Sequence, residues 1–309
     1  MRLRHRATAS TLTRRLQYGA GLLAAGATTV IGTAASSTAS TPADGQSGVV
    51  PVAAAPAQSH HGVLPMRQAG SAAPAVSTGT LHYQNGPTQH ASAVYLVYWG
   101  SQWNSDSNGV QSYMNNLFNG LGTSSDAWSR VTSQYTDSSG AGPTFSGAEL
   151  RGSWVDSASA APSKASASAI SSEANKAASH FGVSGPNVQI VVLSPSGTHP
   201  DGFPNTGFCA WHDYNGKVPY TNMPYVLDAG SSCGANSVRS KLDGFSIVEG
   251  HEYAETLTDP EPPSGYVASD GEENGDLCAW KGLGAIGLPT GTFAMQPTWS
   301  NKANGCAMS

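Results

Sequence analysis

The strongest chemical pattern in this sequence is a histidine followed by two glutamates, within residues 250–255 (GHEYAE). On a helix, side chains four positions apart lie on one face, so His251 and Glu255 would point at the same metal ion. Glu252 would then be placed to take a proton from a water bound to that metal. The pattern is the HExxH sequence of zinc peptidases with glutamate in place of the second histidine.

The glutamate at position 255 bears on which metal such a site would prefer. One imidazole with carboxylates still suits Zn²⁺, because mixed nitrogen and oxygen ligands occur in zinc peptidases. An additional carboxylate weakens the Lewis acidity of the metal and leaves Ca²⁺ or Mn²⁺ open, since both prefer oxygen. So short a pattern also arises by chance on a solvated helix face. The apolar residues Phe245, Ile247 and Val248 indicate instead a partly buried helix.

A second acidic cluster follows at residues 270–276 (DGEENGD), just before Cys278. A catalytic zinc needs a third protein ligand and an open position for water. We expect Glu273 or Asp276 to supply that ligand from the loop after the helix. The alternatives are a solvated turn or a separate Ca²⁺ loop, although the spacing of an EF-hand is lacking.

The other histidines carry weaker signals. His212 follows Cys209 closely and is a candidate to orient substrate or stabilise an oxyanion, while a purely structural histidine is the alternative. His199 lies past a predicted strand end, where sites gather in α/β proteins. His60, His61 and His90 have no supporting context.

Two other hydrolase classes fit the residues less well. A serine hydrolase would show a GxSxG elbow, and the nearest segment, residues 194–197 (SPSG), is a poor match. A glycosidase would need two carboxylates across a cleft, which Glu252, Glu255, Glu273 and Asp276 could provide. That interpretation leaves His251 without a role.

The candidate site must be positioned by strands that alternate with helices. Continuous apolar runs at residues 93–100 and 188–193 indicate buried strands, with further strands expected near 144–155, 220–227 and 292–299. Helical spacing is present at 110–121, 163–181 and 242–257, and a further helix is expected at 127–135. This alternation predicts a single α/β domain: a mixed, mainly parallel sheet with helices on both faces.

The N-terminal part of the chain predicts export. Residues 1–40 begin with arginines and continue through an Ala- and Gly-rich apolar stretch to small residues, which indicates a removable signal peptide of the Sec or Tat type rather than a membrane anchor. Residues 41–78 are rich in Ala, Pro, Ser and Gly, and we expect a disordered spacer or pro-region. Residues 79–309 would then form the secreted domain.

Charge and cysteine content agree with this assignment. The chain has 15 Lys and Arg against 20 Asp and Glu, and residues 1–40 hold five of the arginines, so removing them leaves 10 against 20. An acidic protein is a poor candidate for binding nucleic acid. Four cysteines in an exported protein predict two disulfides. Of the three possible pairings we favour Cys209–Cys233 and Cys278–Cys306, whose loops of roughly 25 residues would each contribute on the order of 3 kcal/mol.

Several segments taken together resemble the Exordium, or phosphate-induced-protein, family of exported proteins, in particular a bacterial HExxE-containing branch. The resemblance is collinear over about residues 80–309. It is carried by residues 81–87, 94–100, 201–203, 208–209, 251–260, 273–278 and 293–299, with Cys306. It implies export, disulfides and an association with the cell wall, without an agreed catalytic activity.

The sequence therefore favours a secreted, zinc-dependent, metallopeptidase-like hydrolase that acts on extracellular protein or cell-wall polymer. We expect it to be a monomer without a stable membrane span after cleavage. The alternative is a non-catalytic extracellular protein that binds the cell wall or polysaccharide.

Overall fold

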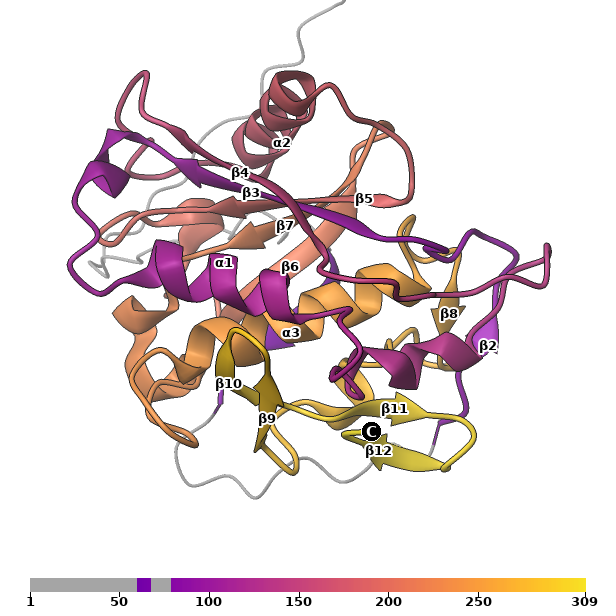
Figure 1. Cartoon of the computed structure of the whole chain (residues 1–309). Coiled ribbons are helices and arrows are strands. Elements are labelled where there is room, and N and C mark those ends of the chain that lie inside the picture. The colour runs from indigo at the N-terminus through magenta and orange to yellow at the C-terminus, as the bar shows by residue number, and fades with distance from the viewer. Residues whose placement is uncertain (1–59, 68–78) are drawn as a thin grey trace, which may run out of the picture. The chain divides into compact units, whose positions relative to one another are not determined.

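The computed structural model describes residues 60–67 and 79–309, and within them the largest sheet has six strands in the order β1-β6-β7-β5-β3-β4 (Figure 1). β4, β3, β5 and β7 pair in parallel, whereas β6 is antiparallel to both of its neighbours. The strands are β1 His61–Pro65, β3 Ala93–Trp99, β4 Leu150–Asp156, β5 Val188–Leu193, β6 Phe208–Tyr214 and β7 Pro219–Met223. The prediction of an α/β protein with a mixed, mainly parallel sheet is confirmed.

The remaining elements surround this sheet. Two-stranded sheets are formed by β2 with β8, by β9 with β10 and by β11 with β12. The helices are α1 Val110–Gly120, α2 Ala167–Phe181 and α3 Asp243–Thr258. The additional strands are β2 His82–Tyr83, β8 Tyr266–Val267, β9 Gly284–Leu288, β10 Gly291–Met295, β11 Thr298–Ser300 and β12 Gly305–Ala307.

The central strands are the two that the apolar runs predicted. Every residue of β5 is buried, and β3 is buried over its last four residues. Such strands show no alternation because both faces of the sheet are covered by other parts of the chain. Figure 1 draws α2 above the strands and α1 and α3 below them.

Helix α2 has the capping residues that its sequence predicts. The Ser166 hydroxyl accepts a hydrogen bond from the N–H of Ala169, and Gly182 ends the helix in the left-handed conformation. The helix begins four residues later than expected, at Ala167, because Ser166 is its N-cap. It packs against β3, β5 and β7.

Helix α3 carries the HExxE pattern and is buried along its whole length. It packs against β1, β6 and β7 of the large sheet and against β10 on another side. It ends at Thr258, one residue beyond the predicted end, because Asp259 precedes Pro260 and leaves the helical conformation there. A buried helix with three glutamates is unusual, since isolated charges are costly in the interior.

Two predicted elements differ from the structure. The helix expected at residues 127–135 is a short 3-10 helix, Ser129–Gln134, which ends where Tyr135 takes an extended backbone conformation. The strand expected at 292–299 is divided into β10 and β11. Pro297 lies between them, and a proline has no backbone N–H to continue a strand ladder.

The spacer expected at residues 41–78 contains a strand. Residues 61–65 form β1, which pairs antiparallel with β6 at the border of the large sheet. The expectation of disorder was wrong for residues 60–67, because pairing with a distant strand overrides a weak local signal. The rest of the predicted spacer up to residue 78, and the predicted signal peptide at residues 1–40, lie outside the described residues.

Both favoured disulfides are present, Cys209–Cys233 and Cys278–Cys306. Among the residues that the structure describes, no helix is long and apolar enough to cross a membrane.

A buried glutamate ahead of β4 gives a prediction about pH and stability. Glu149 is 2% exposed and accepts a hydrogen bond from Ser92, and burial raises its pKa from 4.5 to about 7. Ionising this carboxyl in the folded protein is therefore unfavourable, and the protein loses stability as the pH rises from about 4.5 to 7. We expect Glu149→Gln to be more stable than wild type by about 3 kcal/mol at pH 8, and to gain little at pH 4.

Urea unfolding at the two pH values checks this expectation. An equal change in unfolding free energy at pH 4 and pH 8 would contradict it, since the effect would then come from packing rather than from the charge of Glu149.

Candidate metal centre

Helix α3 carries three side chains that could bind a metal ion, and all three lie in the interior. His251, Glu252 and Glu255 are each fully buried. His251 and Glu255 lie four positions apart, and their Nε2 and Oε1 atoms are 3.0 Å apart. The convergence expected from the i, i+4 spacing is therefore present. His251, Glu252 and Glu255 form one group whose ligand atoms all lie within 4.8 Å of one another.

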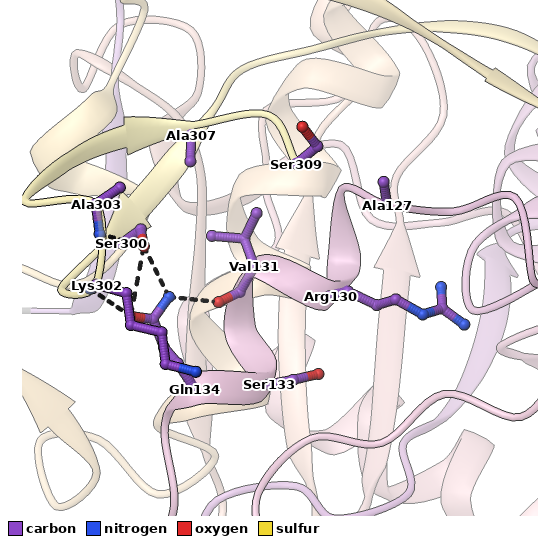
Figure 2. A pocket seen from close by; sticks show the side chains of 10 residues that line it. All are labelled: Ala127, Arg130, Val131, Ser133, Gln134, Ser300, Lys302, Ala303, Ala307 and Ser309. Atoms are coloured by element: carbon purple, nitrogen blue, oxygen red, sulfur yellow. Dashed lines mark hydrogen bonds between the residues drawn. The ribbon is translucent and has the colours of Figure 1, made fainter.

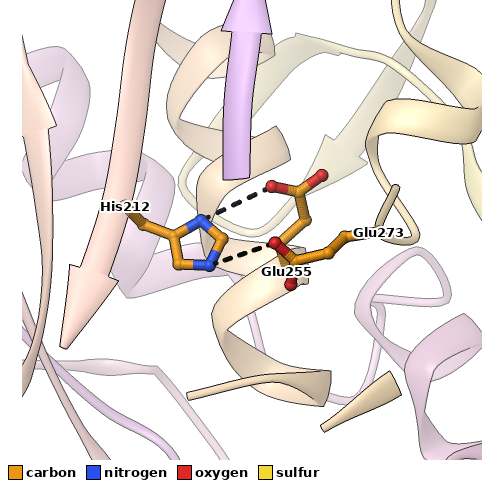
Figure 3. Close-up of side chains that lie close together, drawn as sticks. All are labelled: His212, Glu255 and Glu273. Atoms are coloured by element: carbon orange, nitrogen blue, oxygen red, sulfur yellow. Dashed lines mark ion pairs between the residues drawn. The ribbon is translucent and has the colours of Figure 1, made fainter. Parts of the chain in front are cut away.

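A second group joins the same helix to β6 and to the loop after the helix. His212 on β6 lies 3.4 Å from Glu255 Oε2 through its Nδ1 atom and 3.5 Å from Glu273 Oε2 through its Nε2 atom (Figure 3). These three residues again offer ligand atoms within 4.8 Å of one another. Glu255 belongs to both groups, with Oε1 facing His251 and Oε2 facing His212.

The loop that carries Glu273 is fixed against α3 by backbone and side-chain hydrogen bonds. The N–H of Asp276 donates to Glu255 Oε1 at 2.9 Å. Asn274 donates to the carbonyl of Ala254 and to the Thr258 hydroxyl. Gly275 has no side chain, and a Cβ atom there would lie 2.7 Å from His251 Nδ1. Glycine is thus needed for the loop to approach the histidine so closely.

Gln296, just before β11, contacts the ring nitrogen of His251 that does not face Glu255. Its Nε2 atom lies 2.9 Å from His251 Nδ1 and donates to the Gly275 carbonyl at 2.9 Å. This contact fixes the imidazole ring and leaves Nε2 facing Glu255 and, at 3.4 Å, Asp276. The second nitrogen of a metal-binding histidine usually donates a hydrogen bond, whereas Nδ1 of His251 accepts one from the Gln296 amide.

Several buried atoms of the centre have no hydrogen-bond partner. They are His212 Nε2, His251 Nε2, Glu252 Oε1, Glu255 Oε2 and Glu273 Oε1. Unpartnered polar atoms in the interior are costly, and here they are gathered at one place. Imidazole nitrogens together with carboxylate oxygens are donors that suit Zn²⁺, and also Mn²⁺. The residues present therefore fit a divalent metal.

The pKa values of these groups show how strongly they interact. Burial raises the pKa of Glu252 to about 7, although His212 and His251 oppose the rise. Burial would likewise raise the pKa of Glu255, but His251 and His212 outweigh it and lower the value to about 2. Burial raises the pKa of Glu273 well above its usual range. One carboxylate is thus held ionised at the centre while its neighbours resist ionisation.

The pKa values of the two histidines are raised as well, against the effect of burial. Burial alone would lower the pKa of each imidazole, but Glu273 and Glu252 raise that of His212 well above its usual value. Glu255 and Asp276 do the same for His251. In the absence of a metal, the imidazolium ions would act as counter-ions of the carboxylates.

The predicted site residues are brought together, with changes in their relations. Glu273 lies within a metal-type group, whereas Asp276 lies beside the centre, partly exposed, and accepts a hydrogen bond from the N–H of Glu273. Glu273 thus lies with His212 and Glu255, and Asp276 lies beside His251, so neither group contains His251, Glu255 and Glu273 together. His212 was expected to act on the substrate, and the structure places it among the donors.

The histidines without a clear sequence signal lie elsewhere or have other partners. His199 Nδ1 contacts the carbonyl of Phe203, and His90 pairs with Asp137. Neither belongs to the centre.

Glu249 was not identified from the sequence. It is fully buried on α3, and neither of its carboxylate oxygens has a hydrogen-bond partner. Burial raises its pKa well above the usual range, and Glu252 adds to the effect. Its position three residues before Glu252 is the only local signal that could have indicated it.

A separate pocket opens away from the metal centre. It lies between the 3-10 helix Ser129–Gln134 and the β11–β12 hairpin (Figure 2). Its lining includes Arg130, Gln134 and Lys302 and none of the candidate metal ligands. This hollow is therefore not part of the chemistry described above.

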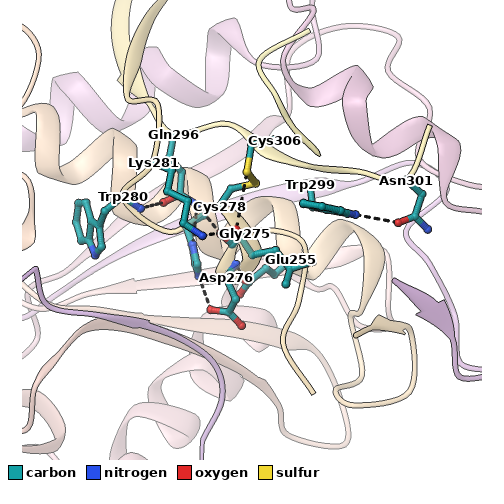
Figure 4. Close-up of a disulfide and its surroundings, with 12 residues drawn as sticks. Glu255, Gly275, Asp276, Cys278, Trp280, Lys281, Gln296, Trp299, Asn301 and Cys306 are labelled. Atoms are coloured by element: carbon teal, nitrogen blue, oxygen red, sulfur yellow. Dashed lines mark hydrogen bonds and ion pairs between the residues drawn. A yellow bond between two sulfur atoms is a disulfide. The ribbon is translucent and has the colours of Figure 1, made fainter. Parts of the chain in front are cut away.

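The disulfide Cys278–Cys306 closes the chain just after the acidic loop (Figure 4). We expect the double variant Cys278→Ser/Cys306→Ser to lose about 2–5 kcal/mol of stability. We also expect weaker metal binding, because the 3-10 helix Asp276–Cys278 donates the N–H that holds Glu255. Chemical unfolding and zinc titration measure the two effects.

The matched control is Cys209→Ser/Cys233→Ser, whose loop is similar in length, with a sequence separation of 24 against 28. Strand β6 is also held by its ladder with β7, so this control should lose stability while its metal affinity changes less. Equal losses of affinity in both double variants would contradict the specific role of the second disulfide.

Comparison with known proteins gives no family assignment. No protein-family model matches the chain, and neither a curated protein nor a solved structure matches it. The resemblance to the Exordium family stays a prediction.

Proposed function

We propose that this protein is a secreted, zinc-dependent, metallopeptidase-like hydrolase. The observation that carries the proposal is the gathering of buried, unpartnered nitrogen and oxygen donors from α3, β6 and the acidic loop around Glu255. Such a gathering is costly to fold, and a bound ion would satisfy these atoms more fully than the ion pairs between the residues themselves.

The donors have distinct places in this proposal. Glu255 is common to both groups, and His251, His212 and Glu273 would be the further donors. The group of His212, Glu255 and Glu273 would leave one position of a tetrahedral zinc site for water. Bound Zn²⁺ would supply Lewis acidity and lower the pKa of that water toward about 7.

Glu252 is the proposed proton carrier. Its Oε1 atom has no partner, while Oε2 lies 3.2 Å from His212 Nδ1, which fixes the orientation of the carboxylate. A carboxylate in this position could accept a proton from the attacking water and return it to the departing amine. Asp276 adds negative charge beside His251 and fixes the position of Glu273.

Metal analysis combined with a hydrolysis assay tests the proposal. The purified protein is equilibrated with Zn²⁺, freed of excess, and assayed on an unfolded protein substrate with and without a chelator. We expect bound zinc and chelator-sensitive cleavage. A protein that takes up no divalent metal would overturn the proposal.

A second candidate function is favoured by the complete burial of the donors. His212, His251, Glu252 and Glu255 are all 0% exposed, as in a metal site that serves only stability. The protein would then be a non-catalytic extracellular protein that binds cell-wall polymer. Bound zinc without hydrolysis, together with retention on wall material, would support this second function.

The remaining expectations enter the proposal with it. We infer export followed by removal of the signal segment, and the two disulfides support an oxidising compartment. Further parts of the proposal are membership of the Exordium-like proteins, a monomeric state, and a single domain with helices on both faces of its sheet.

A further inference from the structure

The strand β1 lies directly against the candidate metal centre. Gly62 has a φ of +47°, and a Cβ atom on it would lie 1.9 Å from His212 Cε1 and 2.9 Å from Glu255 Oε2. The backbone of Gly62 thus covers donor atoms from both sides of the centre. No side chain other than hydrogen fits at this position.

β1 occupies the position of an added strand beside β6. His61 pairs with His212, and Val63 pairs with Trp211, in an antiparallel ladder. Without β1, strand β6 would be the edge of the sheet and would offer its free N–H and C=O groups next to His212. An edge of this kind binds extended peptides by adding them as a further strand.

The segment 60–67 is held as a peptide would be held in a binding groove. The His60 ring stacks on Trp211, with centroids 4.0 Å apart, and pairs with Asp201 at 2.7 Å. Leu64 is fully buried in the main core. Trp280 donates to the carbonyl of Pro65 at 2.7 Å. The two residues of β1 that point inward are therefore Gly62, which lies over the centre, and Leu64, which lies in the apolar core.

The backbone at Gly62 departs from a regular strand. The register of the ladder shifts between His61 and Val63, and the left-handed conformation of Gly62 lies at this irregularity. A bulge redirects the peptide groups on either side of it. A segment with this bulge can occupy the place of a substrate strand beside β6. Its peptide groups are then turned away from the directions that those of a regular strand would take.

We propose that residues 61–65 occupy the binding position of an extended peptide substrate and block the metal centre in cis. This inference rests on the proposed function and deepens it, because it names the substrate class. The ligand is an extended peptide that pairs antiparallel with β6, with glycine next to His212 and an apolar residue two positions later. This internal segment covers His212 and Glu255.

The test uses the full chain with a recognition sequence for a specific protease placed within residues 70–76, cut after folding. A second form also carries Leu64→Ala, so that the cut segment dissociates. A synthetic peptide with the sequence of residues 60–67 (HHGVLPMR) is then added, and its binding is followed by calorimetry and by the fluorescence change from stacking on Trp211. The matched control peptide carries Gly62→Val.

We expect the peptide to bind the cut Leu64→Ala form and the valine control to bind at least about 10-fold more weakly, because its side chain would overlap His212. We expect a chelator to remove zinc at least about 10-fold faster from the cut form than from the uncut chain. Hydrolysis of an unfolded protein should appear on cutting and be inhibited by the peptide.

The outcomes separate this inference from the proposed function. Peptide binding with glycine selectivity but no hydrolysis supports the occupancy by β1 and overturns the peptidase. Equal hydrolysis by the cut and uncut chains overturns the inference and leaves the peptidase standing. Absence of peptide binding to the cut form, or equal binding of both peptides, also overturns the inference.

Discussion

Replacing Glu252 by glutamine should reduce hydrolysis by about 10²- to 10⁴-fold while leaving the zinc content unchanged. Glutamine preserves the size of the side chain and can keep the contact that Glu252 makes with His212 at 3.2 Å. It cannot accept and return a proton. The loss should appear in kcat, because the group acts on the reacting water rather than on binding of the substrate. Steady-state kinetics with metal analysis of the same preparation measures both quantities.

Glu149→Gln is the matched control for this prediction. Glu149 is also a buried glutamate whose pKa burial raises to about 7, but it lies before β4 and belongs to neither metal-type group. Its variant should keep full activity. Undiminished hydrolysis by Glu252→Gln would remove Glu252 from the mechanism, and loss of zinc in that variant would assign it as a ligand instead.

The local features of this fold were readable from sequence because short-range rules govern them. The buried strands β3 and β5 are continuous apolar runs, and the end of α3 is set by Asp259 before Pro260. The i, i+4 spacing of His251 and Glu255 on a helix needs no tertiary information. These features predicted correctly that His251 and Glu255 meet on α3.

The features that the sequence did not indicate depend on contacts between distant segments. His212 meets Glu255 because β6 packs against α3, and a histidine three residues after a cysteine gives no sign of that contact. β1 is a short segment within an Ala- and Pro-rich stretch, and its structure comes from pairing with β6. Strand formation of this kind is set by the partner more than by the strand's own residues.

Replacing Glu255 by glutamine should remove the metal, with affinity reduced by at least about 100-fold, more than the loss of a supporting residue outside the ligand shell. Glu255 is the residue that both metal-type groups share, so its charge is needed whichever group holds the ion. In the metal-free protein the variant should also lose a component of acid sensitivity. The pKa of Glu255 lies at about 2 in the folded state, since His251 and His212 outweigh burial, against 4.5 in the unfolded chain. Its contribution to stability is present above about pH 4.5 and is lost as the pH falls toward 2.

Glu249→Gln is the matched control, because Glu249 lies on the same helix, is equally buried and belongs to neither group. Its pKa is raised rather than lowered, chiefly by burial, so its removal should not weaken metal binding and should not reduce acid sensitivity. Zinc titration, and unfolding of the metal-free proteins between pH 2 and pH 5, compare the two variants. Equal zinc affinity in both variants would show that the charge of Glu255 is not what binds the metal. An unchanged acid transition in Glu255→Gln would show that its pairing with the two histidines does not stabilise the fold.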